Sequence, residues 1–229
     1  MRSRKKRRCS LDSLGHKFPN IFAEGRSLYT QSEYCGFGED VIKREGKAYR
    51  QWDPKRSKLA AAIVKRVSQI GMREGDTVLY LGASHGYTPT FVADIVGPKG
   101  TVFCLDIAPR VVRDLARHCA ARPMMIPLLA DANKHEQYSW RVSGCDVLFQ
   151  DIASKDQVRI FTAACDRFLK SGGFGLLSLK ARSVDVTASP MAVFKESLRQ
   201  LEASGLVVVD QRTLEPLERD HALFVVKKK

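Results

Sequence analysis

The chain has 229 residues, of which 44% are hydrophobic and 28% are charged, which is the composition of a globular protein. A chain of this length buries roughly 70–75% of its unfolded surface, so it needs no disulfide or metal to hold a core. Its six cysteines are scattered and form neither a CxxC pair nor a cysteine–histidine cluster. That pattern favours a reducing compartment and predicts no metal site. No apolar run approaches the roughly 20 residues that cross a membrane, so no membrane partner is expected.

The formal net charge of +13 is concentrated at the two ends of the chain. Six of the first ten residues are basic and none is acidic, and the chain closes on Lys227, Lys228 and Lys229. Without these nine residues, 29 basic residues stand against 25 acidic ones, so the body is only slightly basic. Basic tails favour a polyanionic partner, usually nucleic acid, although a merely solvated tail has the same composition.

Three regions are predicted along the chain. Residues 1–15 are expected to be a basic, disordered tail, residues 16–52 a small β-rich element, and residues 53–229 one large domain. A helix is predicted to open at Asp53-Pro54 and to run to Ile70, because Leu59, Ile63 and Val67 recur with helical spacing.

Beyond residue 75 the pattern alternates between short apolar strands and helices, which predicts an α/β fold with a mostly parallel sheet covered on both faces. Strands are expected at 76–81, 101–105, 124–130, 145–150, 173–179, 206–209 and 221–226. Helices are expected at 88–96, 110–121, 157–169 and 191–203.

Ligands of open α/β sheets bind at the carboxyl ends of the strands, so each strand end is a candidate site. The first strand ends in the turn Gly82-Ala83-Ser84-His85-Gly86, where glycine permits a tight turn and a close approach to a ligand. The spacing is not that of dinucleotide binders, and an ordinary strand–helix turn looks similar.

The second strand ends at Asp106, 24 residues after Gly82, where an acid typically accepts hydrogen bonds from the ribose hydroxyls of an adenosine. The third strand ends at Asp131, whose carboxylate suits an adenine amino group but also suits a helix cap or a loop. The turn and the two acids together predict an adenosine site.

The fourth strand ends at Asp151 and the fifth at Lys180, so both ionisable groups are aimed at the same edge. We expect the lysine to pair with a carboxylate, because an isolated buried lysine is costly. The pair is either purely structural or a proton-handling pair, such as a poor nucleophile like a ribose hydroxyl requires.

The chain resembles the fibrillarin family of RNA ribose 2′-O-methyltransferases. The resemblance follows the family's order over residues 49–226 and is most specific in Arg56-Ser57-Lys58-Leu59-Ala60-Ala61-Ala62-Ile63 and in Glu218-Arg219-Asp220-His221. Further matching segments are residues 78–83, 94–98, 151–157, 178–181 and 214–217. The resemblance implies the class I S-adenosylmethionine-dependent methyltransferase fold, which is Rossmann-like and has a seven-stranded sheet.

The resemblance also implies the site residues. The catalytic set is Lys58, Asp151, Lys180 and His221, in which Lys180 activates the ribose 2′-hydroxyl, Asp151 orients Lys180, and Lys58 and His221 position the ribose. S-adenosylmethionine is the implied cofactor. Its implied contacts are Gly82, Ala83, Tyr87, Thr88, Asp106, Ile107, Asp131, Ala132, Asp151, Ile152, Ala153 and Ser154.

The chain departs from the family's pattern in a few places. The turn has Ser84-His85-Gly86-Tyr87-Thr88 where Ala-Ser-Gly-Thr-Thr is usual, the acid of the second strand is Asp106 rather than Glu, and Ser154-Lys155 replaces Gln-Pro. The Gly/Arg-rich extension of eukaryotic members is missing, so the chain looks archaeal and a cytoplasmic location is expected, or a nucleolar one if the source is eukaryotic.

The family works with a box C/D guide RNA, a Nop-domain scaffold protein and a kink-turn-binding protein of ribosomal type, and guide pairing selects the target in rRNA or tRNA. These partners are therefore expected here. Two alternatives stay open, namely a methyltransferase that acts on a protein glutamine and a catalytically inactive module that only assembles an RNA–protein particle.

Overall fold

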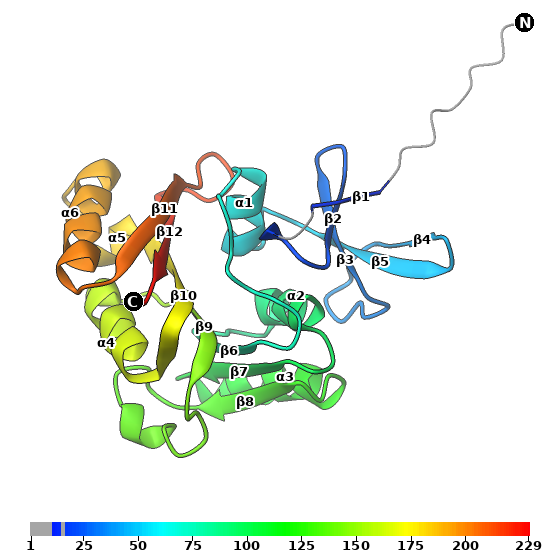
Figure 1. Cartoon of the computed structure of the whole chain (residues 1–229), viewed down its shortest axis with the longest axis horizontal. Coiled ribbons are helices and arrows are strands. Elements are labelled where there is room, and N and C mark those ends of the chain that lie inside the picture. The colour runs from blue at the N-terminus through cyan, green and yellow to red at the C-terminus, as the bar shows by residue number, and fades with distance from the viewer. Residues whose placement is uncertain (1–10, 15–16) are drawn as a thin grey trace, which may run out of the picture.

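The protein is described by a computed structural model that covers residues 11–14 and 17–229 and builds two sheets (Figure 1). The tail predicted for residues 1–15 lies mostly outside these residues, but its described part contains a strand, β1, at Asp12–Ser13. The N-terminal sheet therefore begins before residue 16, where the β-rich element was expected to begin. The division into three regions otherwise stays a prediction.

The seven-stranded sheet has the strand order β11-β12-β10-β9-β6-β7-β8. The five strands β10, β9, β6, β7 and β8, which are neighbours in this order, are mutually parallel. Strand β12 is antiparallel to both of its neighbours. The predicted, mostly parallel sheet is confirmed. The strands are β6 (Thr77–Leu81), β7 (Thr101–Asp106), β8 (Met125–Leu129), β9 (Cys145–Gln150), β10 (Leu169–Lys180), β11 (Val207–Thr213) and β12 (His221–Lys227).

Helices cover both faces of this sheet, because alternate side chains of the inner strands enter two different cores. In β6, for example, Tyr80 belongs to one buried cluster and Leu79 to the other. In Figure 1, α4 and α6 lie on one side of the sheet, and α2 lies near the N-terminal sheet. The helices are α1 (Lys58–Val64), α2 (Tyr87–Val96), α3 (Pro109–Ala120), α4 (Gln157–Phe168), α5 (Ala181–Val184) and α6 (Pro190–Ala203).

The chain leaves β6 for β7 and β8 on one side and then returns to β9 on the other side of β6. The carboxyl ends of β6 and β9 thus form the point where the strand order reverses, which is where open α/β sheets bind ligands.

The first helix is shorter than predicted, because α1 begins at Lys58 rather than at Pro54. The Asp53 carboxylate accepts a hydrogen bond from the backbone of Lys55, which holds a turn, and Ser57 caps the helix by accepting from the Ala60 N–H. The helix ends before Arg66, whose φ of 61° is left-handed. Val67 and Ile70 are nonetheless buried, so the apolar spacing at these positions reflects burial in the core rather than a continued helix.

The N-terminal sheet is antiparallel and has the order β1-β2-β3-β5-β4. It packs on α2 through Trp52, whose ring stacks on Phe91 at 4.8 Å between centroids, and through the buried Arg50, which donates to Asp94 at 2.7 Å. Its further strands are β2 (Ile21–Glu24), β3 (Ser27–Gln31), β4 (Val41–Arg44) and β5 (Lys47–Trp52). The two sheets thus share one core.

Candidate active site

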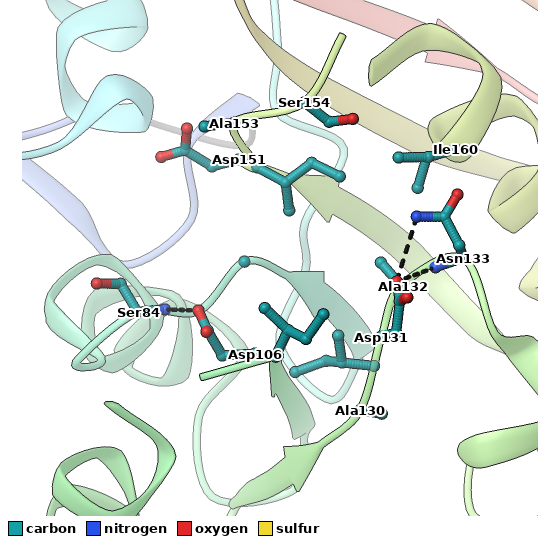
Figure 2. A pocket seen from close by; sticks show the side chains of 14 residues that line it. Ser84, Asp106, Ala130, Asp131, Ala132, Asn133, Asp151, Ala153, Ser154 and Ile160 are labelled. Atoms are coloured by element: carbon teal, nitrogen blue, oxygen red, sulfur yellow. Dashed lines mark hydrogen bonds between the residues drawn. The ribbon is translucent and has the colours of Figure 1, made fainter. Parts of the chain in front are cut away.

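A cavity of about 310 Å³ opens at the carboxyl ends of β6, β7, β8 and β9, where the strand order reverses (Figure 2). Its volume lies within the range of small-molecule sites. The predicted cofactor contacts that line it are Gly82, Asp106, Ile107, Asp131, Ala132, Asp151, Ile152, Ala153 and Ser154. Residues that sequence reasoning missed are Ser84, Leu105, Ala130, Asn133 and Ile160.

Two glycines shape the turn beneath the cavity. Gly82 has φ 83°, and its N–H donates to the carbonyl of Leu105 at 2.8 Å, which fastens the turn to the end of β7. Gly86 has φ 97° and precedes the first residue of α2. These left-handed conformations favour glycine, so the two positions are explained by backbone geometry.

Asp106 is held in place by two backbone donors. The Ser84 N–H donates to Oδ2 at 2.9 Å, as Figure 2 shows, and the Ala108 N–H donates to Oδ1 at 3.0 Å. A carboxylate oxygen has two lone pairs, so each oxygen can still accept a second hydrogen bond. The carboxylate is therefore fixed in orientation and able to bind a diol.

Asp131 lies across the cavity in the turn after β8 (Figure 2). The backbone N–H of Asn133 donates to it at 2.9 Å and the side-chain amide at 3.2 Å. The backbone hydrogen bond, with a further contribution from the amide, lowers the pKa of Asp131 below its ordinary value. Asp131 is thus both a turn-forming aspartate and a cavity wall, and the two interpretations left open by the sequence are compatible.

Three expected cofactor contacts are not among the residues that line the cavity. Ala83 is buried in the core, and the Thr88 hydroxyl donates to Ser57 Oγ at 3.0 Å. The hydroxyl of Tyr87 accepts from the Asp53 N–H at 3.2 Å, and the Arg56 guanidinium lies 4.1 Å from its ring centroid. The side chains of Tyr87 and Thr88 therefore fasten α2 to the segment that begins α1.

Asp151 belongs both to the cavity and to the expected catalytic set. Its Oδ2 lies 3.1 Å from Nζ of Lys58, the first residue of α1. The expectation that Asp151 pairs with Lys180 is wrong in this structure, because α1 brings Lys58 to the carboxylate. Burial acts to lower the pKa of Lys58, but Asp151, and then Glu218, outweigh it and raise the pKa above its ordinary value. Lys58 is therefore protonated at neutral pH.

Lys180 and His221 are neighbours across two strands. Lys180 ends β10, His221 begins β12, and their Cα atoms are register partners, so the two side chains leave the same face of the sheet. Nδ1 of the buried His221 lies 2.6 Å from the carbonyl of Arg219. A carbonyl only accepts, so Nδ1 carries a proton, and Nε2 is the ring nitrogen that remains for another partner. The side chain of Lys180 is exposed, without an ion pair in the described part of the chain.

Glu218, in the loop between β11 and β12, is a further acid at this rim that sequence reasoning did not assign. Burial raises its pKa, and Lys58, His221 and Lys180 lower it. Asp151 also raises its pKa, and the net direction is upward, so all four predicted catalytic residues influence the charge of Glu218. The predicted set is thus brought to one rim, although only Lys58 and Asp151 touch. Figure 1 shows this loop beside α1.

Gln157, the first residue of α4, joins the cavity to Lys180. Its buried amide donates to the carbonyl of Ser154 at 2.8 Å and to that of Lys180 at 3.1 Å. Its Oε1 accepts a hydrogen bond from the Lys180 N–H at 3.0 Å. The side-chain amide of Gln150 donates to the backbone carbonyl of Gln157 at 2.8 Å. The amide thus fixes the end of β10 relative to the loop that lines the cavity.

Within residues 11–14 and 17–229, no group of three or more histidine, cysteine or acidic side chains is arranged to hold a metal ion. Over the same residues, no helix is long and apolar enough to cross a membrane.

The sheet order and the cavity at its switch point define a class I methyltransferase fold. A methyltransferase from Aquifex aeolicus, described as S-adenosylmethionine-dependent, has this fold, with a TM-score of 0.53 at 16% identity over 77% of this chain and 98% of that one. The fibrillarin family model matches residues 16–229, and the chain belongs to this family.

The relatives in the family are similar over nearly their whole length. A fibrillarin-like rRNA/tRNA 2′-O-methyltransferase of Thermococcus gammatolerans is 44% identical, covering 93% of this chain and 97% of its own. A Methanococcus jannaschii fibrillarin, described as a pre-rRNA processing protein, superposes with a TM-score of 0.89 at 39% identity, over 96% and 97% of the two chains.

Two further solved relatives carry a cofactor or a partner. Fibrillarin of Aeropyrum pernix, solved with natively bound S-adenosyl-L-methionine, has a TM-score of 0.85 at 34% identity over 95% of this chain and 97% of that one. A fibrillarin solved in complex with Nop5p has a TM-score of 0.84 at 36% identity over 92% and 98%.

Proposed function

We propose that this chain is an S-adenosylmethionine-dependent enzyme that methylates ribose 2′-hydroxyls of rRNA, and of tRNA as a second substrate. The observation that carries the proposal is Asp151, which lines the adenosine-type cavity and at the same time pairs with Lys58 at the rim that holds Lys180 and His221. Cofactor and substrate would therefore meet at one carboxylate.

The residues of the cavity fit the cofactor. Asp106 has the fixed, partly free carboxylate that a ribose diol requires, and Asp131 is aimed into the same cavity. Gly82 leaves the floor of the turn without a side chain. When bound, S-adenosylmethionine supplies a methyl group on a positively charged sulfur.

The residues of the rim suit activation of a ribose hydroxyl, which is a poor nucleophile near neutral pH. Lys180, whose side chain is exposed and without an ion pair in the described chain, either accepts the proton as a neutral amine or, as an ammonium, stabilises the developing alkoxide. Lys58, whose pKa is raised beside Asp151, contributes positive charge, which supports Lys180 rather than Lys58 as the base. Because Nδ1 of His221 binds the Arg219 carbonyl, Nε2 is the nitrogen that would contact the ribose.

The expected assembly is a ribonucleoprotein. A relative bound to Nop5p supports a Nop-domain scaffold as a partner of this chain. A box C/D guide RNA and a kink-turn-binding protein are the further partners of the proposal. The slightly basic body of the chain agrees with this, because an enzyme that works in such an assembly need not bind RNA tightly by itself. A cytoplasmic location, or a nucleolar one in a eukaryote, goes with the same proposal.

The test is transfer of labelled methyl groups to a guide-matched RNA by the reconstituted complex. With Lys180→Ala, we expect the rate of transfer to fall about 10²- to 10⁴-fold, because activation of the hydroxyl is lost. The affinity for S-adenosylmethionine should stay within about twofold, since Lys180 does not line the cavity.

An unchanged rate in Lys180→Ala would refute this role of Lys180. Label on a protein glutamine instead of RNA would favour the protein methyltransferase alternative. Intact particles that bind RNA but transfer no label to anything would favour an assembly module.

A further inference from the structure

Asp220 joins the two strand ends that carry Lys180 and His221. Its backbone is left-handed, with φ 57°, and its carbonyl accepts the N–H of Ala181 at 2.9 Å. Its own N–H donates to Oε1 of Glu215 at 3.0 Å. The backbone of Asp220 is therefore fixed directly beside the rim, and Asp220 is not part of the predicted catalytic set.

Two arginines gather at this carboxylate. Arg182 Nε lies 3.4 Å from Oδ2 of Asp220, and Arg219 Nε lies 4.0 Å from the same oxygen. Arg182 is further oriented by donating to the Val186 carbonyl at 2.7 Å. The Asp220 side chain is 19% exposed, whereas the side chains of Arg182 and Arg219 are 46% and 88% exposed. We call these three residues the Asp220 cluster.

The three residues of the Asp220 cluster carry one positive charge in excess, and the Glu215 carboxylate beside them is engaged by the Asp220 N–H. Each guanidinium has five N–H donors, and the structure gives most of them no protein acceptor among the described residues. Guanidinium forks match the paired oxygens of a phosphate, and charge-assisted hydrogen bonds of this kind are the stronger ones. In sequence, Asp220 directly precedes His221, and Arg182 follows Lys180 by two positions.

We propose that Arg182 and Arg219, held by Asp220, bind a phosphodiester adjacent to the ribose that is methylated. The inference rests on the proposed function, because it requires an RNA substrate at this rim. Phosphate contacts carry no sequence information, but they fix the register of a nucleic acid. The cluster would thus orient the target nucleotide so that its 2′-hydroxyl faces Lys180.

The experiment combines protein variants with neutralised RNA linkages. Methyl transfer by the reconstituted complex is measured on a guide-matched RNA and on two copies in which the linkage 5′ or 3′ of the target nucleotide is a methylphosphonate. For the unmodified protein, we expect one of the two neutral linkages to lower kcat/KM about tenfold. The double variant Arg182→Gln/Arg219→Gln should have a kcat/KM about tenfold lower than the unmodified protein on the all-phosphate RNA. On the RNA whose neutral linkage slows the unmodified protein, the double variant should show no further decrease.

The chain contains a matched control at another carboxylate. On α3, Arg113 and Arg117 both face Asp114, at 3.9 and 3.2 Å, and are 71% and 73% exposed. Arg113→Gln/Arg117→Gln removes the same charge away from the rim and should keep the full response to the neutral linkage. Arg219→Gln alone, which removes a side chain that is 88% exposed, keeps the test valid if the double variant is unstable.

The outcomes separate this inference from the proposed function. If the unmodified complex labels no RNA, the proposed function fails. If it labels RNA but the double and single variants match it, or lose rate equally on all three RNAs, the phosphate site is overturned while the proposed function stands. Affinity for S-adenosylmethionine, measured on each variant, should not change.

Discussion

At Gly82, the first residue of the turn beneath the cavity, the structure tolerates a side chain poorly. Its φ of 83° is strained for other residues, and a Cβ would lie 2.3 Å from the backbone oxygen of Asp151 and 2.7 Å from Ile152. Since backbone cannot move aside as a flexible side chain can, the two ends of β6 and β9 would have to separate. The close approach explains why the turn begins with glycine.

Gly82→Ala should therefore destabilise the fold by roughly 2–4 kcal/mol, from backbone strain and steric contact together. It should also weaken binding of S-adenosylmethionine at least tenfold, because the contact moves Asp151. Thermal unfolding and calorimetric titration measure the two effects. Gly172→Ala is the control, since its φ of 78° gives the same strain with no atom near the added Cβ. Equal loss of cofactor affinity in both variants would contradict the steric explanation.

The identity of Lys58 alone does not decide which role this residue has at the rim. Lysine at this position is compatible with a base or with a fixed positive charge. The 3.1 Å contact with Asp151 favours the charge, because the carboxylate raises the pKa of the ammonium. The electrostatic stability that this pair contributes is present below the ordinary lysine pKa and is lost only as the pH rises through the higher pKa of the folded state. The pair therefore persists through the neutral range.

At the scale of elements, the loop between β9 and α4 and the end of β10 are positioned by one buried amide, that of Gln157. It is fully buried and makes three hydrogen bonds to backbone groups of Ser154 and Lys180. The cofactor loop and Lys180 are thereby held in one geometry, although Lys180 itself does not line the cavity.

Gln157→Met should cost about 3 kcal/mol of stability, because it leaves buried backbone groups without partners. The fall in kcat should exceed the rise in KM for S-adenosylmethionine, since Lys180 is displaced while Asp106 and Asp131 are untouched. Steady-state kinetics with the reconstituted complex separate the two constants, and chemical denaturation gives the stability. A variant with unchanged kcat would show that Gln157 is only a structural residue.

At the scale of the whole molecule, the N-terminal sheet is joined to the methyltransferase sheet by a buried charge network around Asp94 of α2. Its carboxylate binds Arg50 of β5 at 2.7 Å, the hydroxyl of Thr30 of β3 at 2.6 Å, and Arg122. Arg50 also reaches Glu39 at 3.2 Å. Burial lowers the pKa of Arg50, while Asp94 and Glu39 raise it, and the net direction is downward. The network is thus a single unit, in which each charge is desolvated and depends on its partners.

Asp94→Asn should reduce the free energy of unfolding by about 3–5 kcal/mol, because two buried guanidiniums lose their carboxylate. Urea denaturation measures this loss. Glu196→Gln is the control. It removes an exposed partner of Arg199 and should cost about 0–1 kcal/mol. Similar losses in the two variants would argue against a network that fastens the sheets together.

Much of the fold followed from local pattern, and the errors have physical causes. Alternating strands and helices predicted the sheet, because both-face burial leaves continuous apolar runs. The first helix was predicted too long, because Val67 and Ile70 are buried without being helical. The resemblance to the family implies Tyr87 as a cofactor contact, which stays a prediction, and in the structure its ring packs against Arg56 and Phe91.

The sequence by itself determined that Asp106, Asp131, Asp151 and Lys180 lie at one edge of the sheet, since parallel strands present their carboxyl ends together. Only the tertiary structure decided that Asp151 pairs with Lys58 and that Lys180 stays exposed beside His221. The reason is geometric. The positions of the strands follow from local periodicity, whereas an ion pair depends on where α1 docks and on the direction of side chains 93 positions apart.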